Sequence, residues 1–247
     1  MIFINGQNNY LDGGKPAYWR RNAEYKNYQY VPAISFDQEV KDHFEDQNSL
    51  YLDGAIGGLA NTIASGLSNG IISGYLMPKN FAPQNLNYGD RYDAGLAHGE
   101  ASVADLIHSL NHAGGVITES IKIITHSMGG AYAKGFIQAI INYAKAHPKE
   151  AEGLSITEYD FASFQQNKQH AVPGVPLYQF DNLGDRIVDG LIGKAIGSEH
   201  ATEGVVANQQ KDVNPNGGHS IFDFISAVST LQEGKYKYHN GEFVKTP

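Results

Sequence analysis

Residues 121–130 read IKIITHSMGG, and this stretch decides how the rest of the chain is interpreted. Its first half is a short apolar run interrupted by one lysine, which is typical of a buried strand. Its second half supplies a serine and two glycines, and a long amphipathic segment follows at 131–147 and ends before Pro148. We therefore predict a strand, a sharp turn at Ser127 and a helix whose positive N-terminal end lies beside the serine.

The same alternation of strand and helix extends over most of the chain. Strands are expected at residues 1–5, 49–53, 120–125, 155–161 and 175–180, and helices from Ser35 onward and at 102–115, 131–147 and 220–231. Ser35 and Gln38 have the spacing of a capping box, and residues 102–115 end in a Gly-Gly stop. This pattern predicts the α/β class, with a mostly parallel sheet covered by helices on both faces.

The chain is expected to form one main domain over residues 1–233, followed by a short C-terminal unit at 234–247. The C-terminal unit contains KYKYHNGEFVK, which alternates around Asn240-Gly241 and predicts a β-hairpin packed on or appended to the domain. Residues 54–78 carry no charge and include six glycines, yet apolar residues recur there at helical spacing. We interpret 54–90 as a cap or lid insertion, with an ordinary packed helix pair as the alternative.

Composition excludes several classes of function. The 247 residues contain no cysteine and carry a formal net charge of −8, so disulfides, thiolate metal sites and a nucleic-acid partner are not expected. No metal-binding or nucleotide-binding motif is present, and we expect neither a metal nor a cofactor. The N-terminus MIFINGQNNY lacks the features of a signal peptide. We expect delivery outside the cell by another route, or as part of a longer chain, and otherwise a cytoplasmic protein.

The residues around Ser127 resemble the G-x-S-x-G nucleophile elbow of serine hydrolases, with Thr125 in place of the first glycine. HSMGG followed by an apolar helix is similar to the lipase and esterase branch of the α/β-hydrolase superfamily. The resemblance implies an α/β-hydrolase-type fold and makes Ser127 the nucleophile, which needs a general base because a serine hydroxyl is weakly nucleophilic at neutral pH.

In this family the acid follows the serine in the chain, and the histidine follows the acid. His219 lies in a Gly-rich loop before the last helix, the place of the family's catalytic histidine; His200 and His239 are its rivals. Asp185 in GDRIV resembles the family's acid loop. Asp181 in the same loop and Asp160 in the preceding strand are alternative acids.

The resemblance also implies an oxyanion hole made of two backbone N–H groups. One donor is expected at Met128, directly after the nucleophile. The other is expected at Gln7, because FINGQ resembles the family's His-Gly segment, with Asn5 in place of the histidine. These two donors complete the expected site.

The sequence therefore predicts a serine carboxylester hydrolase acting on lipids or phospholipids, with an ester substrate at a membrane surface. A thioesterase, acyltransferase or peptidase of the same fold, or a non-catalytic binding module, stays open as an alternative. The chain is also similar to lipase-like toxin domains of large bacterial secreted proteins. That likeness implies an antibacterial effector with an immunity or inhibitor protein as its partner.

Overall fold

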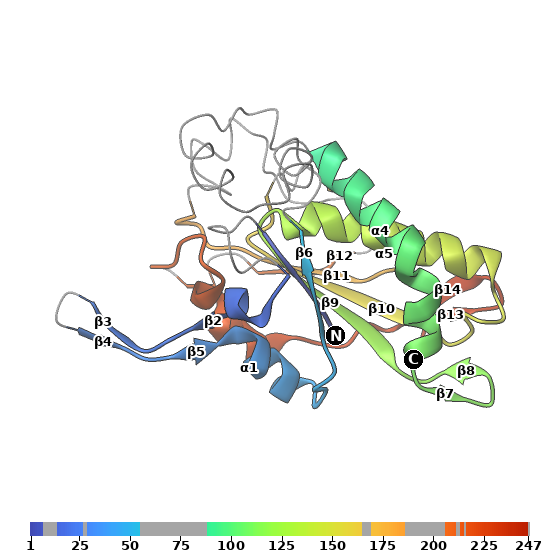
Figure 1. Cartoon of the computed structure of the whole chain (residues 1–247), viewed down its shortest axis with the longest axis horizontal. Helices are drawn as coiled ribbons and strands as arrows, with labels where there is room; N and C mark the ends of the chain where they lie inside the picture. Colours follow the sequence, from blue (N-terminus) through green and yellow to red (C-terminus); the bar gives the residue numbers. More distant parts are fainter. Residues whose placement is uncertain are drawn as a thin grey trace, which may run out of the picture.

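A computed structural model describes residues 1–6, 14–26, 29–54, 88–164, 169–185, 206–210, 213–214 and 216–246. Within these residues the main element is a six-stranded sheet with the order β12-β11-β10-β9-β1-β6, in which every neighbouring pair is parallel (Figure 1). Its strands are β1 (Ile2–Asn5), β6 (Leu50–Asp53), β9 (Ser120–His126), β10 (Ser155–Phe161), β11 (Leu177–Phe180) and β12 (Val206–Gln210). The predicted α/β class with a parallel sheet is confirmed, and β12 is a strand that the sequence analysis did not anticipate.

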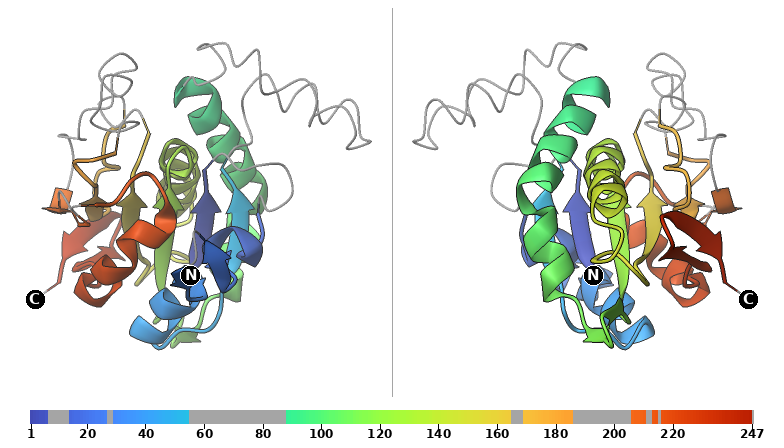
Figure 2. Two further views of the ribbon diagram at one scale, coloured as in Figure 1. Left: turned by 90° about the vertical axis from the view of Figure 1, so that its left-hand side faces the viewer. Right: turned by 90° about the vertical axis from the view of Figure 1, so that its right-hand side faces the viewer.

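Helices cover both faces of this sheet (Figure 2). The long helices α4 (Tyr88–Ser109) and α5 (Gly129–Ala146) pack against each other on one face. Helix α1 (Phe36–His43) and the 3-10 helices η1 (Pro16–Trp19) and η4 (Ile221–Thr230) lie on the other. The sheet is therefore buried on both sides, and every residue of β10 and every residue of β9 after Ser120 is buried, the polar ones included.

Alternate residues of each strand enter two separate cores. Ile121 and Ile123 of β9 pack with α4 and α5, whereas Ile124 packs with α1, η1 and η4. The same alternation places Ile4 of β1 in the first core and Phe3 in the second. This period of two decides on which face the polar residues at the end of β9 lie.

The direction in which the chain winds along the sheet reverses between β1 and β9. The chain passes from β1 to the edge strand β6, returns through α4 to β9 on the other side of β1, and then continues outward to β12. In open α/β sheets, ligands bind outside the carboxyl ends of the strands at such a reversal. Strand β1 ends at Asn5 and strand β9 ends at His126, so both carboxyl ends lie at this reversal.

Two predicted helices differ from expectation in their ends. Ser35 is the N-cap residue of α1, but its side chain makes no capping hydrogen bond, and Gln38 donates instead to Asp42 Oδ1 at 2.8 Å. Helix α4 starts at Tyr88, well before residue 102, because its glycines allow close contact with α5: a Cβ at Gly95 would lie 2.0 Å from the Tyr132 carbonyl oxygen. The expected Gly-Gly stop is wrong as well. Helix α4 ends at Ser109, and the two glycines form the turn of a short hairpin, β7 (His112–Ala113) with β8 (Val116–Ile117).

The C-terminal part of the chain agrees closely with the predicted secondary structure. The segment expected as an amphipathic helix is the 3-10 helix η4, whose three-residue turn buries Ile221, Phe224 and Ala227 on one side. The predicted C-terminal hairpin is present as β13 (Tyr236–His239) and β14 (Glu242–Lys245), with positive φ at both turn residues. It packs on the domain through Tyr238, which is buried and donates from its hydroxyl to the Ala144 carbonyl oxygen at 2.9 Å.

A small β arm precedes α1. It consists of β2 (Arg20–Arg21) with β5 (Ile34–Ser35), and of β3 (Glu24–Lys26) with β4 (Gln29–Val31) (Figure 1). The proposed cap at 54–90 lies outside the described residues except for its two ends, Gly54 and the first turn of α4. The part of the acid loop after Asp185 also lies outside them.

Candidate active site

The serine at the centre of IKIITHSMGG lies at the carboxyl end of β9, at the reversal point of the sheet. Ser127 directly follows His126, the last residue of β9, and α5 begins two residues later at Gly129. Its φ is +56°, a left-handed conformation that is uncommon and strained for a residue with a side chain. Backbone hydrogen bonds keep it there, because Ser127 N donates to Phe161 O at 3.0 Å and Phe164 N donates to Ser127 O at 3.1 Å.

The turn requires residues without side chains on two sides. A Cβ at Gly129 would lie 2.3 Å from the Ile4 carbonyl oxygen, so only glycine lets the start of α5 approach β1 this closely. A Cβ at Gly6 would lie 2.5 Å from the Cβ of Ser127 and 3.1 Å from the Met128 nitrogen. Gly6 therefore leaves space directly beside Ser127 and the amide that follows it.

His219 joins the serine to a carboxylate. Its Nε2 lies 2.7 Å from Ser127 Oγ, and its Nδ1 lies 2.7 Å from Asp185 Oδ2. An ionised carboxylate only accepts hydrogen bonds, so Nδ1 carries the proton and Nε2 is left to accept from the serine hydroxyl. Asp185 and Ser127 are buried, while the side chain of His219 is 20 % exposed. A serine, an imidazole and a buried carboxylate thus form one continuous hydrogen-bonded chain.

The rival residues do not occupy these positions. Both ring nitrogens of His219 are used by Ser127 and Asp185, so neither Asp181 nor Asp160 bonds to the imidazole, although both are fully buried. His239 lies in the terminal hairpin and contacts Glu152, and its side chain is 60 % exposed. His200 lies outside the described residues.

Thr125, which replaces the first motif glycine, points away from the serine. Its hydroxyl donates to Asp160 Oδ1 on the neighbouring strand β10 at 2.6 Å, on the face covered by α5. Lys134 of α5 donates to Asp160 Oδ2 at 3.0 Å and forms an ion pair with Glu158 at 2.7 Å. The threonine therefore belongs to a buried polar cluster under α5 and does not crowd the turn.

The loop that carries His219 is held by residues that the sequence analysis did not single out. Asn182 donates from Nδ2 to Gly218 O at 3.0 Å and accepts at Oδ1 from Asn214 N at 2.8 Å. Asp223 in η4 accepts from Gly218 N at 2.8 Å. Because Asn182 precedes Asp185 by three residues, it ties the acid loop to the histidine loop. Its position next to Asp181, after an apolar strand, was the only sequence feature pointing to it.

The expected oxyanion donors are only partly described. Gln7 lies outside the described residues, whereas Met128 is the buried residue directly after the serine, at the N-terminus of α5. Asn5, which stands where the resemblance implies histidine, donates from Nδ2 to Gly6 O at 2.6 Å and to Asp53 Oδ1 at 3.0 Å. It therefore fixes the backbone at Gly6, next to Ser127.

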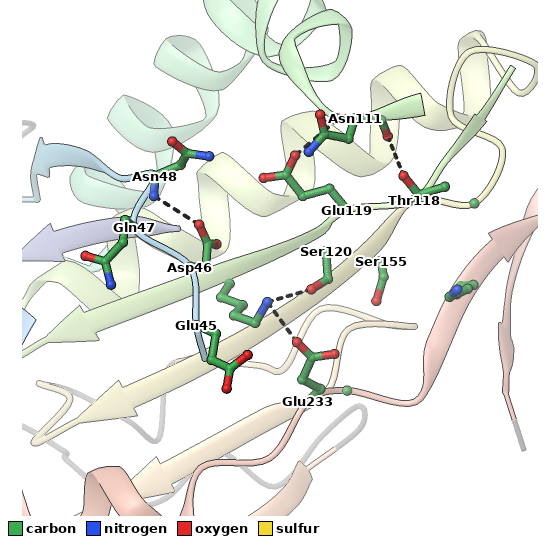
Figure 3. A pocket seen from close by; sticks show the side chains of 14 residues that line it. Glu45, Asp46, Gln47, Asn48, Asn111, Thr118, Glu119, Ser120, Ser155 and Glu233 are labelled. Atoms are coloured by element: carbon green, nitrogen blue, oxygen red, sulfur yellow. Dashed lines mark hydrogen bonds and ion pairs between the residues drawn. The ribbon is translucent and has the colours of Figure 1, made fainter. Parts of the chain in front are cut away.

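A polar hollow of about 450 Å³ lies at the opposite end of the same strands (Figure 3). Ser120 and Ser155, the first residues of β9 and β10, line it. Lys122 donates to Ser120 Oγ at 2.8 Å and forms an ion pair with Glu233 at 2.8 Å. No histidine is among the described residues that line this hollow, so it offers its serines no imidazole base. The candidate site is therefore the carboxyl end of the sheet.

Among the residues that the structure describes, no group of three or more His, Asp or Glu side chains is arranged to hold a metal ion. No helix in the described ranges is long and apolar enough to cross a membrane. Comparison of the chain with protein-family models, with curated proteins and with solved structures finds no match. The functional argument therefore depends on the geometry of the site.

Proposed function

We propose that the chain is a serine hydrolase of the α/β-hydrolase type that cleaves carboxylic esters of lipids through an acyl-enzyme intermediate. The observation that carries the proposal is the hydrogen-bonded chain from Ser127 Oγ through His219 to Asp185, built on a serine with positive φ. The order serine, aspartate, histidine along the sequence agrees with that of α/β hydrolases. The parallel sheet, with the nucleophile after the strand next to its reversal point, supports the same assignment.

The first half of the reaction transfers the acyl group to the enzyme. Ser127 Oγ attacks the ester carbonyl carbon while its proton passes to His219 Nε2. Asp185 keeps the proton on Nδ1 and stabilises the imidazolium that forms. When the tetrahedral intermediate collapses, the alcohol oxygen takes the proton from Nε2 and leaves, and the acyl group stays on Ser127.

The second half returns the enzyme to its starting state. A water molecule takes the place of the alcohol, gives one proton to His219 Nε2 and attacks the acyl carbon. Collapse of the second intermediate breaks the bond to Ser127 Oγ, which regains the proton from Nε2, and the carboxylic acid is released. Each proton taken up by the imidazole is therefore returned within the same half-reaction.

Negative charge on the carbonyl oxygen needs backbone donors. The Met128 N–H is assigned this role because it follows the nucleophile and belongs to the positive end of α5. Gln7 is proposed as the second donor from the sequence resemblance. In such sites, removal of one donor typically costs about 3 kcal/mol of transition-state stabilisation.

A lipid substrate is supported by apolar character near the site. Leu183 lies two residues before Asp185 and is 58 % exposed, so an apolar side chain faces solvent beside the proposed acid. The uncharged residues 54–78, between β6 and α4, support the same preference as a proposed cap. We also propose from the sequence that the protein acts outside the producing cell as an effector with a dedicated inhibitor protein.

The test is hydrolysis of p-nitrophenyl esters with acyl chains from short to long, below and above the concentration at which the substrate aggregates. We expect wild-type turnover with a preference for long chains at the aggregate surface, and loss of activity by about 10⁴-fold or more in Ser127→Ala. Ser163→Ala is a matched control, because Ser163 is also buried but bonds only to Gln169 within the described contacts. Equal activity in wild type and Ser127→Ala would refute the mechanism, and faster turnover of thioesters than of esters would favour a thioesterase.

A further inference from the structure

His126, the residue before the nucleophile, has no role in the reaction just described. Its ring lies on the face of the sheet covered by α1 and η4, opposite to that of Thr125, and is only 5 % exposed. Its Nε2 lies 2.7 Å from the carbonyl oxygen of His219, and its Nδ1 is hydrogen-bonded to the Tyr18 hydroxyl. The centroids of the His126 and His219 rings are 5.1 Å apart. Both nitrogens of a buried imidazole are thus used beside the general base.

These partners define the protonation of His126. A carbonyl oxygen only accepts, so Nε2 must carry a hydrogen and donate to His219 O. Burial, together with the nearby His219, lowers the pKa of His126 to about 3, so the ring is neutral and Nδ1 is an acceptor. Tyr18 supplies the matching donor. Burial raises the pKa of Tyr18, against the opposing effect of a backbone hydrogen bond from Gly6, so its hydroxyl stays protonated.

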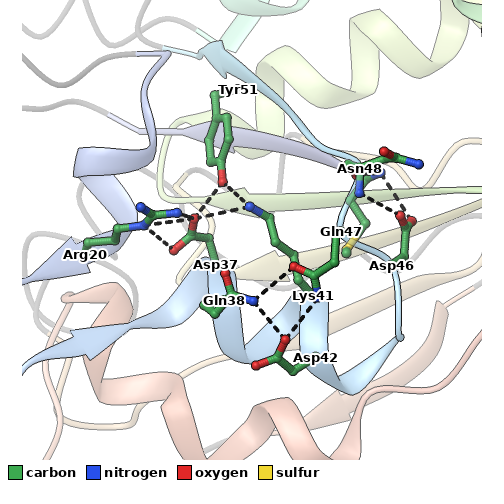
Figure 4. Close-up of polar contacts among 10 residues, drawn as sticks. Arg20, Asp37, Gln38, Lys41, Asp42, Asp46, Gln47, Asn48 and Tyr51 are labelled. Carbon is green, nitrogen blue, oxygen red and sulfur yellow. Dashed lines mark hydrogen bonds and ion pairs between the residues drawn. The ribbon is translucent and has the colours of Figure 1, made fainter.

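Tyr18 itself is placed by the residues that follow it along the chain, among them Arg20, which bonds to Asp37 of α1 (Figure 4). In the next residues along the chain, Trp19 is fully buried against Phe3 and Phe36, and Arg20 donates to both carboxylate oxygens of Asp37 at 3.0 and 2.7 Å. Asp37 also accepts from the Tyr51 hydroxyl at 2.6 Å. Burial opposes ionisation of Asp37, but the hydrogen bonds from Arg20 and Tyr51 outweigh it and lower its pKa. The carboxylate is therefore charged at neutral pH and anchors the segment on α1.

We propose that the partly buried Tyr18 and the buried His126 form a positioning pair that fixes the backbone of His219 and so sets its imidazole at bonding distance from Ser127. The role rests on the proposed function, because it concerns the general base of that reaction. Asn182 and Asp223 hold the neighbouring Gly218 at its carbonyl and its amide, and His126 is the side chain that holds His219 at its own carbonyl. Neither Tyr18 nor His126 makes or breaks a bond with substrate.

The neutral state of His126 matters for this position. During each half-reaction His219 becomes positively charged, and a second cation 5.1 Å away would oppose that change. An imidazole with its hydrogen on Nε2 donates one hydrogen bond without adding charge. Lysine or arginine at this place would supply a donor but would also make His219 a weaker base.

The kinetic test compares variants that keep or remove the donor. In His126→Phe, which keeps a ring without a donor, we expect kcat to fall by about 10-fold or more with KM within about two-fold, because small displacements of a base slow proton transfer. His126→Gln, whose amide reaches the Nε2 position, should recover to within about three-fold of wild type, and Tyr18→Phe should fall between them. Tyr159→Phe is the matched control, since it removes a buried tyrosine hydroxyl bonded to Gln232 O, outside the site. Unchanged kcat in a folded His126→Phe would overturn the proposal.

A second measurement does not require activity. Nitrogen NMR of isotope-labelled histidines should show His126 neutral, with its hydrogen on Nε2, to below about pH 5, and a change of this signal in Tyr18→Phe. A hydrogen on Nδ1, or titration at the ordinary value of a histidine, would overturn the positioning pair even if no His126 variant folds. If the protein cleaves no ester while His126 shows the expected tautomer, the proposed function fails and the pairing geometry stands.

Discussion

Two adjacent residues, Thr125 and His126, lead to polar clusters of opposite character on the two faces of the sheet. Thr125 enters the cluster under α5, in which Asp160, Glu158 and Lys134 are at most 1 % exposed. His126 and Ser127 lead to His219, whose side chain is 20 % exposed at the carboxyl end of the strands. One cluster is closed to solvent, whereas the other contains an imidazole that is partly exposed to solvent.

The closed cluster contains hydroxyl, carboxylate and ammonium groups but no imidazole, and its charges are balanced internally. Burial and the neighbouring Asp160 raise the pKa of Glu158 to about 8, despite the opposing effect of Lys134. At neutral pH Glu158 therefore keeps its proton, which reduces the negative charge that is buried beside Lys134. The comparison teaches that residue types alone do not mark a catalytic site; access and an oriented base do.

The largest expected effect separates the acid of the open site from its rivals. Asp185→Asn should lower kcat/KM by about 10⁴-fold, because the amide no longer holds the His219 tautomer that accepts from Ser127. Asp181→Asn and Asp160→Asn, assayed per mole of folded protein, should stay within about 10-fold of wild type. A comparable loss of kcat/KM in only one of these two variants would assign the acid role to that residue.

The next effect concerns the stability of the closed cluster. Lys134→Met removes the ammonium that pairs with both buried carboxyl groups of this cluster, so we expect a loss of about 3–5 kcal/mol in the free energy of unfolding by urea. Lys145→Met, on the exposed side of the same helix, should change it by less than about 1 kcal/mol. Similar values for the two variants would mean that the cluster contributes no special stability.

Thr125 provides a smaller effect that distinguishes the two faces. Thr125→Val keeps the shape and removes the hydroxyl that donates to Asp160 at 2.6 Å, which should cost about 1–3 kcal/mol of stability. Since the side chain points away from Ser127, kcat should stay within about two-fold of wild type. A large loss of kcat at unchanged stability would place Thr125 in the open site.

Glu158→Gln should have the smallest effect at acid pH and a growing one as the pH rises through neutrality. The folded protein keeps the Glu158 proton up to about pH 8, whereas the unfolded chain releases it near the ordinary value of 4.5. Stability from this group is therefore complete below the lower value and decreases as the pH rises to the higher one. Near pH 4 the carboxyl group is protonated in the folded chain and largely protonated in the unfolded chain, so glutamine should change the free energy of unfolding by about 1 kcal/mol or less. At pH 7 the unfolded wild-type chain has released this proton and the variant has none to release, so the variant should be more stable relative to wild type than it is at pH 4. Urea unfolding from pH 4 to 9 should show a weaker decline in the variant than in wild type, and parallel curves would contradict the raised pKa.

Much of the fold was predictable because its signals are local. The period of the apolar residues and the turn at Asn240-Gly241 indicated most strands, α5 and the terminal hairpin. The early start of α4 was not predicted: the local propensity of Gly95 disfavours a helix, whereas in the structure this glycine allows close packing on α5. Contacts between distant segments override local preference in such cases.

The residues of the candidate site show the same difference between local sequence signals and contacts that only the fold creates. Ser127 was identified from a local motif, and His219 and Asp185 from loops that resemble those of a known family, and the structure brings the three together. Tyr18, His126 and Asn182 had no such pattern. Tyr18 is 108 residues from His126 along the chain, and only the folded backbone brings them into contact. Positioning residues are harder to predict than the groups they position, because their requirement is a distance and not a residue type.

Covalent labelling of Ser127 tests the central claim most directly. An alkyl fluorophosphonate reacts with a serine that is activated by an imidazole, and mass spectrometry of the digested protein locates the adduct. We predict one adduct per chain, on the peptide that contains Ser127, with labelling slowed by about 10³-fold or more in His219→Ala. No adduct in folded wild-type protein, or equal labelling of wild type and His219→Ala, would contradict the assignment of an activated nucleophile.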